Sequence, residues 1–294
     1  MLTRYRGAGG GGGGGGPAPP PICNYTFDCD LHDPVAVSLE RRLASRASRD
    51  GRLVLYLVGD SLVMGQFYGL CKLATGELPD QTTPHPEYAM SCQSAELYAI
   101  FLWSPGYNAS VARWLVTEHP PPDVVYFDGG VHLLHLHPGR PMQADMFERL
   151  LHFQERLQSF VLAWSAAAPG ARLSVMPPNA ICPEKFFGRW RKIAEDPHRS
   201  AKLCADDMLA GGAAPQEAVA SICERFPFTD VGARNIQQAI NQAVQGLPMP
   251  AKEKTLVVDQ HALTTGHCSQ TCDGRHYKPL VLRQLDLFFW TNGW

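Results

Sequence analysis

The feature that most constrains the fold is a repeated alternation between short apolar runs and longer amphipathic segments. Residues at helical spacing are apolar in segments 31–49, 61–74, 146–167 and 279–289. The short runs are apolar at nearly every position, as strands covered on both faces are, and they fall at 53–58, 97–103, 124–127, 173–176 and 255–258. Strands that alternate with helices predict an α/β domain: a three-layer, doubly wound parallel sheet of about five strands.

The chain divides into three parts by composition. Residues 1–22 are a polyglycine run followed by prolines, which has no apolar surface to bury and is expected to be a disordered linker or stem. Residues 23–50 are a lead-in segment with a cysteine pair and a helix. Residues 51–294 carry the alternating pattern and are expected to form one domain, in which 197–245 is helical or irregular.

Charge and hydropathy exclude two classes of partner. The chain of 294 residues has 26 basic and 28 acidic side chains and no basic run, so no nucleic acid partner is expected. No apolar stretch approaches the ~20 residues that cross a bilayer, so no transmembrane segment is expected. The oligomeric state stays open.

The cysteine content points to an oxidising compartment. Nine cysteines are dense for a cytosolic enzyme of this size, and two glycosylation sequons begin at Asn24 and Asn108. We therefore expect a location in the secretory pathway lumen (Golgi) or outside the cell. The N-terminus has no apolar region typical of a signal peptide, and the expectation is that a signal or anchor has been lost upstream. The odd count leaves one thiol, expected to be Cys71 because it falls within an apolar helix.

Two short blocks supply a serine, a histidine and a carboxylate. The first strand-like run ends in Gly59-Asp60-Ser61, and Asp273-Gly-Arg-His276-Tyr277 lies near the C-terminus. Nucleophilic acyl transfer needs this set, because a histidine must take the serine proton and a carboxylate must hold the histidine in the right tautomer. The serine is expected at a strand-to-helix junction, where a helix N-terminus favours negative charge. The alternative is that Ser61 and Asp60 only cap the helix.

The two blocks resemble those of the SGNH, or GDSL-type, hydrolase superfamily, whose first block is Gly-Asp-Ser after the first strand and whose last is Asp-x-x-His. The likeness covers about 51–294 and is strongest to the PC-esterase and trichome-birefringence-like branch, many of whose members are carbohydrate O-acetyltransferases or esterases. It implies a flavodoxin-like sheet of SGNH type and an esterase or O-acyltransferase that uses no cofactor or metal. It also implies Ser61 as nucleophile, His276 as base and Asp273 as its orienting carboxylate. The implied substrate is an O-acyl ester of a small molecule or a glycan.

The oxyanion site is the point at which the sequence departs from that family. Backbone N–H groups of Ser61 and Gly106 are the expected donors. Relatives carry an asparagine after the next strand, whereas this chain reads Asp128-Gly-Gly130-Val-His132. An ionised aspartate would repel an oxyanion. Three options follow: backbone glycines suffice, His132 donates, or the protein is a catalytically impaired lumenal binding protein.

Other residues offer alternatives to the triad. His261 and His267 are rival bases, and Asp259 is a rival carboxylate. A zinc site could in principle combine the histidines of one segment, His132, His135 and His137, with Cys268, Cys272 and His276. The cysteines fit disulfides better than zinc. The three histidines are therefore expected to line the substrate cleft or to cap the next segment.

Two further features of the sequence bear on the cleft. Cys268 and Cys272 either pair with each other, which would stiffen the approach to Asp273, or pair elsewhere. Trp103, Tyr107 and Trp190 either stack on a sugar or pack in the core.

Overall fold

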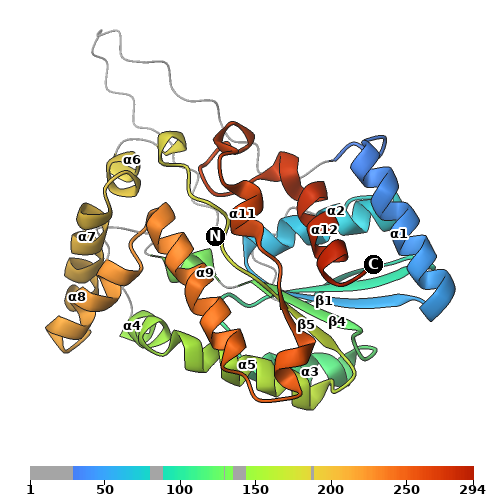
Figure 1. The fold of residues 1–294 in the computed structure, drawn as a ribbon, viewed down its shortest axis with the longest axis horizontal. Coiled ribbons are helices and arrows are strands. Elements are labelled where there is room, and N and C mark those ends of the chain that lie inside the picture. The colour runs from blue at the N-terminus through green and yellow to red at the C-terminus, as the bar shows by residue number, and fades with distance from the viewer. Residues whose placement is uncertain (1–28, 80–88, 129, 135–143, 187–188) are drawn as a thin grey trace, which may run out of the picture.

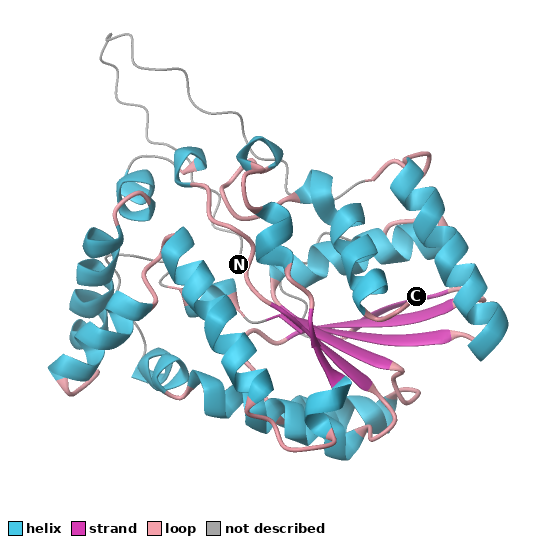
Figure 2. Ribbon diagram, in the orientation of Figure 1, coloured by secondary structure: helices cyan, strands magenta, loops and turns pink. Residues whose placement is uncertain are grey.

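The fold is a six-stranded sheet between two layers of helices (Figures 1 and 2). The computed structural model describes residues 29–79, 89–128, 130–134, 144–186 and 189–294. The strand order is β2-β3-β1-β4-β5-β6, with every pair parallel except β2 and β3. The strands are β1 (Leu53–Gly59), β2 (Met90–Gln93), β3 (Leu97–Trp103), β4 (Val124–Asp128), β5 (Arg172–Met176) and β6 (Thr255–Val257). The predicted α/β class is confirmed.

Helices cover both faces of the sheet. On one face α1 (Pro34–Asp50), α2 (Ser61–Thr75) and α12 (Val281–Thr291) contact one another, and on the other α5 (Phe153–Ala167) contacts α3 (Ser110–Glu118) and α9 (Asp230–Gln245) (Figure 1). The remaining helices are α4 (Ala144–Leu151), α6 (Arg189–Ala194), α7 (Pro197–Ala210), α8 (Gln216–Arg225), α10 (Ala251–Lys254) and α11 (Gln260–Thr264). Short 3-10 turns form at Val131–Leu133, Pro183–Lys185, Cys268–Gln270 and Lys278–Leu280.

The core is centred on β1 and β4, which are flanked by strands on both sides. Every residue of β4 is buried, and the ring of Tyr56 in β1 packs edge-on against Trp164 in α5. Each such large apolar side chain contributes about 1.5–3 kcal/mol by leaving water. The lead-in helix α1 shares this core, because its Leu39 and Leu43 are buried among the same residues. Segment 1–22 and Cys23 lie outside the described residues.

The elements differ from the predicted ones at three places. The edge strand β2 was not predicted, because it is short and alternates half-buried with exposed residues. Helix α3 was not predicted either. The long helix expected over 146–167 is two helices, α4 and α5, that meet at His152, whose backbone is not helical (φ −102°, ψ 28°).

Three disulfides form among the described cysteines. Cys71 pairs with Cys92 and so ties α2 to β2, which makes the expectation of a free Cys71 wrong: the edge strand that carries its partner was not foreseen. Cys204 pairs with Cys223 between α7 and α8. Cys268 pairs with Cys182 in the segment after β5, so it does not pair with Cys272.

Within the ranges given above, none of the helices has both the length and the apolar composition that a membrane span requires.

Candidate active site

The carboxyl end of β1 places Ser61 at the start of a helix. Asp60 adopts an extended conformation (φ −107°, ψ −158°), and its side chain caps α2 by accepting from the Leu62 N–H at 2.8 Å. Ser61 is the first residue of the 15-residue α2. In open α/β sheets ligands bind beyond the carboxyl ends of the strands, and a helix N-terminus favours negative charge. The hydroxyl therefore lies where a developing anion would be stabilised.

Ser61, His276 and Asp273 form one chain of hydrogen bonds although 215 positions separate the first two in sequence. Ser61 Oγ lies 2.7 Å from His276 Nε2, and His276 Nδ1 lies 2.5 Å from Asp273 Oδ2. A carboxylate can only accept, so Nδ1 carries the ring proton and Nε2 is free to accept from the serine. The structure thus brings together the three residues of the two sequence blocks in the order that acyl transfer needs.

Asp273 is held in its ionised form by its own loop. Its Oδ1 accepts from the His276 N–H at 2.9 Å and from the Arg275 N–H at 3.2 Å. Burial alone would raise the pKa of this carboxyl, but the hydrogen bonds and charge of His276, with the nearby Arg275, outweigh burial and hold the pKa well below its usual range. An ionised Asp273 at neutral pH is what keeps the His276 ring oriented.

Asp128 does not face the position expected of an oxyanion residue. It is 3 % exposed, and its oxygens accept from the Asp60 N–H at 3.0 Å and from the Gly130 N–H at 2.8 Å. Gly59 permits this approach, because a Cβ there would stand 2.9 Å from Asp128 Oδ2. Asp128 therefore lies on the core side of the turn that carries Ser61 and supports that turn by accepting from the Asp60 N–H.

Burial also determines the charge of Asp128. Burial, and then the charge of Asp60, raise the pKa of Asp128 well above its usual range, and burial raises the pKa of Asp60 as well. Two adjacent buried carboxyls cannot both ionise at low cost, so the pair keeps a proton. The expected repulsion between an ionised Asp128 and an oxyanion therefore does not fit this geometry.

The other expected oxyanion residues lie around the same turn. Gly106 (φ +94°) follows β3, and this loop runs beside the end of β1 because the Ser104 N–H donates to the Gly59 carbonyl at 2.9 Å. Within the described part of the chain, the N–H groups of Ser61 and Gly106 donate to no protein acceptor. The Gly130 N–H is instead used by Asp128.

His132 lies beside the turn as well. Its Nε2 is 3.6 Å from Asp60 Oδ2, its side chain is 35 % exposed, and its ring contacts Trp103 edge-on at 5.8 Å. Trp103 is therefore the aromatic residue that borders the site. Tyr107 instead packs in the core, and Trp190 packs on Phe228. His135 and His137 lie outside the described residues.

The rival acid and base residues have other partners. His261 Nε2 lies 3.0 Å from Asp230 Oδ1 and is almost fully buried. Asp259 caps α11 by accepting from the Ala262 N–H at 2.9 Å. His267 is exposed just before the Cys268–Gln270 turn.

Among the described residues, three side chains lie close enough together to share an ion: Cys182, Glu184 and Cys268. Two of these three form a disulfide and so offer no thiolate. The group therefore fits a covalent link better than a metal centre.

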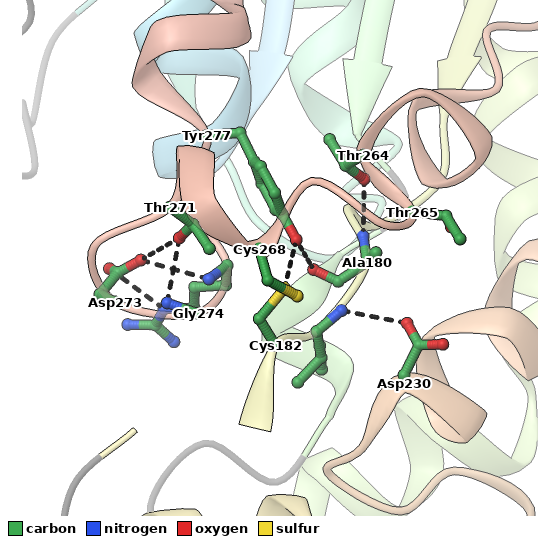
Figure 3. Close-up of a disulfide and its surroundings, with 12 residues drawn as sticks. Ala180, Cys182, Asp230, Thr264, Thr265, Cys268, Thr271, Asp273, Gly274 and Tyr277 are labelled. Atoms are coloured by element: carbon green, nitrogen blue, oxygen red, sulfur yellow. Dashed lines mark hydrogen bonds and ion pairs between the residues drawn. A yellow bond between two sulfur atoms is a disulfide. The ribbon is translucent and has the colours of Figure 1, made fainter. Parts of the chain in front are cut away.

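Two residues outside the sequence motifs, Cys182 and Thr271, support the loop that carries Asp273 and His276. Figure 3 shows Cys182 joined to Cys268, with the Tyr277 hydroxyl 2.9 Å from Cys182 Sγ. The Gly274 N–H donates to Thr271 Oγ1 at 3.0 Å, which closes the turn before His276. Thr-x-x-Gly is a short polar pattern that occurs in many loops, so the sequence offered only a weak signal for this turn.

Comparison with known proteins gives only distant likeness. No protein-family model matches the sequence, and a search of curated proteins found no match. A carbohydrate esterase family 3 structure from Talaromyces cellulolyticus is 14% identical (TM-score 0.39), with 82% of this chain and 99% of that chain covered. A presumed GDSL-like lipase from Parabacteroides merdae is 11% identical (TM-score 0.41; 82% and 95% covered).

Another presumed GDSL-like lipase, from Bacteroides ovatus, is 11% identical (TM-score 0.41; 80% of this chain covered), and this chain spans about half of it (50%). Likeness at this level carries no argument about activity, so the functional conclusion is drawn from the site.

Proposed function

We propose that this protein is a serine-dependent acyl-transfer enzyme of SGNH type, an esterase or O-acetyltransferase that acts on O-acyl esters. The observation that carries the proposal is the continuous chain from Ser61 Oγ through His276 to the Asp273 carboxylate. A hydroxyl within 2.7 Å of an imidazole nitrogen whose other nitrogen is held by a carboxylate is the arrangement of an activated nucleophile.

The proposed reaction has two halves. Ser61 Oγ attacks the acyl carbonyl while its proton passes to His276 Nε2, and the N–H groups of Ser61 and Gly106 stabilise the oxyanion. The intermediate expels the alcohol, which takes the proton from His276, and an acyl-Ser61 ester remains. Water or a sugar hydroxyl then attacks the acyl carbon while His276 Nε2 takes its proton. The bond from the acyl carbon to Ser61 Oγ breaks, Oγ takes the proton back from His276, and the acid or the acylated sugar leaves. The acceptor that enters in this second half decides between esterase and transferase.

A catalytically impaired binding protein was the alternative suggested by Asp128. The orientation of Asp128, whose two oxygens accept from backbone N–H groups, supports the enzyme over that alternative. The substrate class proposed is an acylated small molecule or carbohydrate. Trp103, at the border of the site, offers an aromatic face against which an apolar sugar face can stack.

The proposed location is the secretory pathway or the outside of the cell. Three described disulfides support an oxidising compartment, since such bonds are rare in the cytosol. Asn108, in the sequon that the structure describes, is exposed and thus accessible to a glycosyl donor.

Turnover of a chromogenic acetyl ester tests the proposal. We expect Ser61→Ala and His276→Ala each to lower kcat/KM by about 10³-fold or more, because the residues act as a unit. Ser221→Ala is the control, since Ser221 is an exposed serine within a helix, α8, that carries none of the proposed site residues. Wild-type turnover in either triad variant would contradict the assignment. A sugar acceptor added to the same assay separates acyl transfer from hydrolysis.

A further inference from the structure

We propose that Asn179 is a positioning residue for His276, and that Gln284 sets the orientation of the Asn179 amide. The inference rests on the proposed function, because it concerns the same catalytic loop. Asn179 follows β5 and is 2 % exposed, so its side chain has exchanged water for protein partners. A buried amide of this kind is stable only when both its ends are satisfied.

The donor end of Asn179 holds the backbone next to the catalytic histidine. Its Nδ2 donates to the Arg275 carbonyl at 3.0 Å. That carbonyl belongs to the peptide unit that joins Arg275 to His276. Because the peptide unit is planar, its position limits where the His276 Cα can lie and in which direction the imidazole leaves the chain. Asn179 thus acts on His276 through the backbone and need not touch the substrate.

The acceptor end of Asn179 is fixed by a second buried amide. Gln284, on α12 and 2 % exposed, donates from Nε2 to Asn179 Oδ1 at 3.0 Å. This bond fixes the orientation of the Asn179 amide. If the amide were reversed, Asn179 Nδ2 would face Gln284 Nε2, a second donor, and Asn179 Oδ1 would face the Arg275 carbonyl oxygen, a second acceptor. The Gln284 backbone carbonyl accepts in turn from Gln260 Nε2 at 3.2 Å. Both ends of the buried Asn179 amide are therefore paired, which favours one orientation of its side chain.

The segment that contains Asn179 also holds Gly274, the residue before Arg275. The Cys182 N–H donates to the Gly274 carbonyl at 2.9 Å, and the Tyr277 hydroxyl donates to the Ala180 carbonyl at 3.0 Å. Figure 3 shows these residues beside the Cys182–Cys268 disulfide. Two consecutive carbonyls, of Gly274 and Arg275, are therefore held by the segment 179–182. Both lie directly before His276, where a small displacement changes the distance to Ser61.

The expected effect is on turnover more than on binding. A displacement of about 1 Å can cost about 10²-fold in rate. We expect Asn179→Ala to lower kcat by about 10- to 100-fold, with KM within about twofold of the parent, and to slow labelling of Ser61 by a fluorophosphonate to a similar degree. Gln284→Met keeps the side-chain length without the amide, and we expect it to lower kcat in the same direction by a smaller factor.

A double variant tests whether the two residues act along one path. If Gln284 acts through Asn179, the kcat of Asn179→Ala/Gln284→Met equals that of Asn179→Ala alone. Asn235→Ala is the matched control, because Asn235 also donates its Nδ2 to a backbone carbonyl, that of Arg225 at 2.6 Å, at an exposed helix end outside the site. We expect its kcat to equal that of the parent. All assays are run well below the melting temperature of the least stable variant.

Three results would overturn the inference. One is a parental kcat in folded Asn179→Ala; a second is independent, multiplicative losses in the double variant; the third is a loss of kcat in Asn235→Ala as large as in Asn179→Ala. If Asn179→Ala does not fold, a parental kcat in Gln284→Met still refutes it. Ser61→Ala in the same assay separates the two proposals: if it stays active, the proposed function fails, whereas if it alone is inactive, only the positioning role fails.

Discussion

At the scale of single residues, the buried Asp128 carboxyl accepts from the N–H groups of Asp60 and Gly130 and so holds the turn that carries Ser61. The resemblance to the SGNH superfamily places an asparagine at this position, and Asp128 was therefore expected near the oxyanion. Its direction depends on two features that no local pattern displays: the absence of a side chain at Gly59 and the N–H of Asp60, which lies 3.0 Å from its carboxyl. By contrast, the Asp273–His276 pairing was predictable, because the two residues lie three positions apart and a single loop can orient both.

Removal of the Asp128 carboxyl is expected to destabilise the fold. Asp128→Ala leaves the buried N–H groups of Asp60 and Gly130 without acceptors, each at about 1–3 kcal/mol, whereas Asp128→Asn keeps one acceptor and should cost less. Urea unfolding measures both. Asp206→Ala, on the exposed side of α7, serves as control and should change the free energy of unfolding by about 0.5 kcal/mol or less. Equal stability of Asp128→Ala and the control would contradict the supporting role.

Asp273→Asn tests the tautomer of His276. The amide would offer a donor where His276 Nδ1 now donates to a carboxylate, so the ring would favour the tautomer with its proton on Nε2 and could no longer take the proton of Ser61. We expect kcat to fall by about 10⁴-fold with KM little changed. Steady-state kinetics with the acetyl ester measures this. A loss of less than tenfold would show that Asp273 does not orient the base.

At the scale of elements, a disulfide ties the loop of Asp273 and His276 to the segment after β5, and this link could not be read from the sequence. Nine cysteines allow many pairings, and 86 positions separate Cys182 from Cys268. The missed β2 bears on a second cysteine: Cys71 was expected to be the free thiol because it lies in an apolar helix, whereas it pairs with Cys92 of β2. The five parallel strands were predictable because each is a near-continuous apolar run, whereas a short, half-exposed edge strand carries no such pattern.

The Cys182–Cys268 bond should matter for turnover and the Cys204–Cys223 bond should not. Replacement of either pair by serine should lower stability by about 2–4 kcal/mol. Of these two variants, Cys182→Ser/Cys268→Ser should lower kcat, because that bond joins the loop of Asp273 and His276 to the segment after β5, whereas Cys204–Cys223 joins α7 to α8. Thermal unfolding and steady-state kinetics on both variants measure the two effects. A matching loss of kcat in the Cys204→Ser/Cys223→Ser variant would contradict a specific role for the loop bond.

For the whole molecule, the strand order explains how distant blocks meet. β1 lies in the middle of the sheet, so the turn after it, with Ser61, is surrounded by the loops after β3 and β4, and the C-terminal loop closes over it. The alternating pattern predicted this arrangement, because parallel strands bring their carboxyl ends to one edge. The buried amides of Asn179 and Gln284 were not predictable, since each depends on contacts between β5, α12 and the loop.

The pH dependence of stability should have two opposite contributions. The pKa of Asp273 is lowered in the folded state, so its contribution is fully present above its unfolded pKa of about 4 and is lost as pH falls below it. The pKa of Asp128 is raised, so the folded state binds the extra proton and stability falls as pH rises above about 4.

Urea unfolding across a pH series measures these slopes. Asp273→Asn should flatten the loss of stability below about pH 4, and Asp128→Asn should reduce the decline above it. Asp206→Asn, at an exposed position, should leave both slopes as they are in the parent. Slopes in Asp273→Asn and Asp128→Asn that match the parent would contradict the assigned charge states.

The central claim, an activated Ser61, is tested most directly by intact-mass labelling with a fluorophosphonate, run on the parent and on Ser61→Ala. The account predicts a single adduct on the parent and none on the variant, because only a serine whose proton is taken by His276 reacts at a useful rate. An unlabelled parent that is well folded, or an adduct that persists in Ser61→Ala, would contradict it.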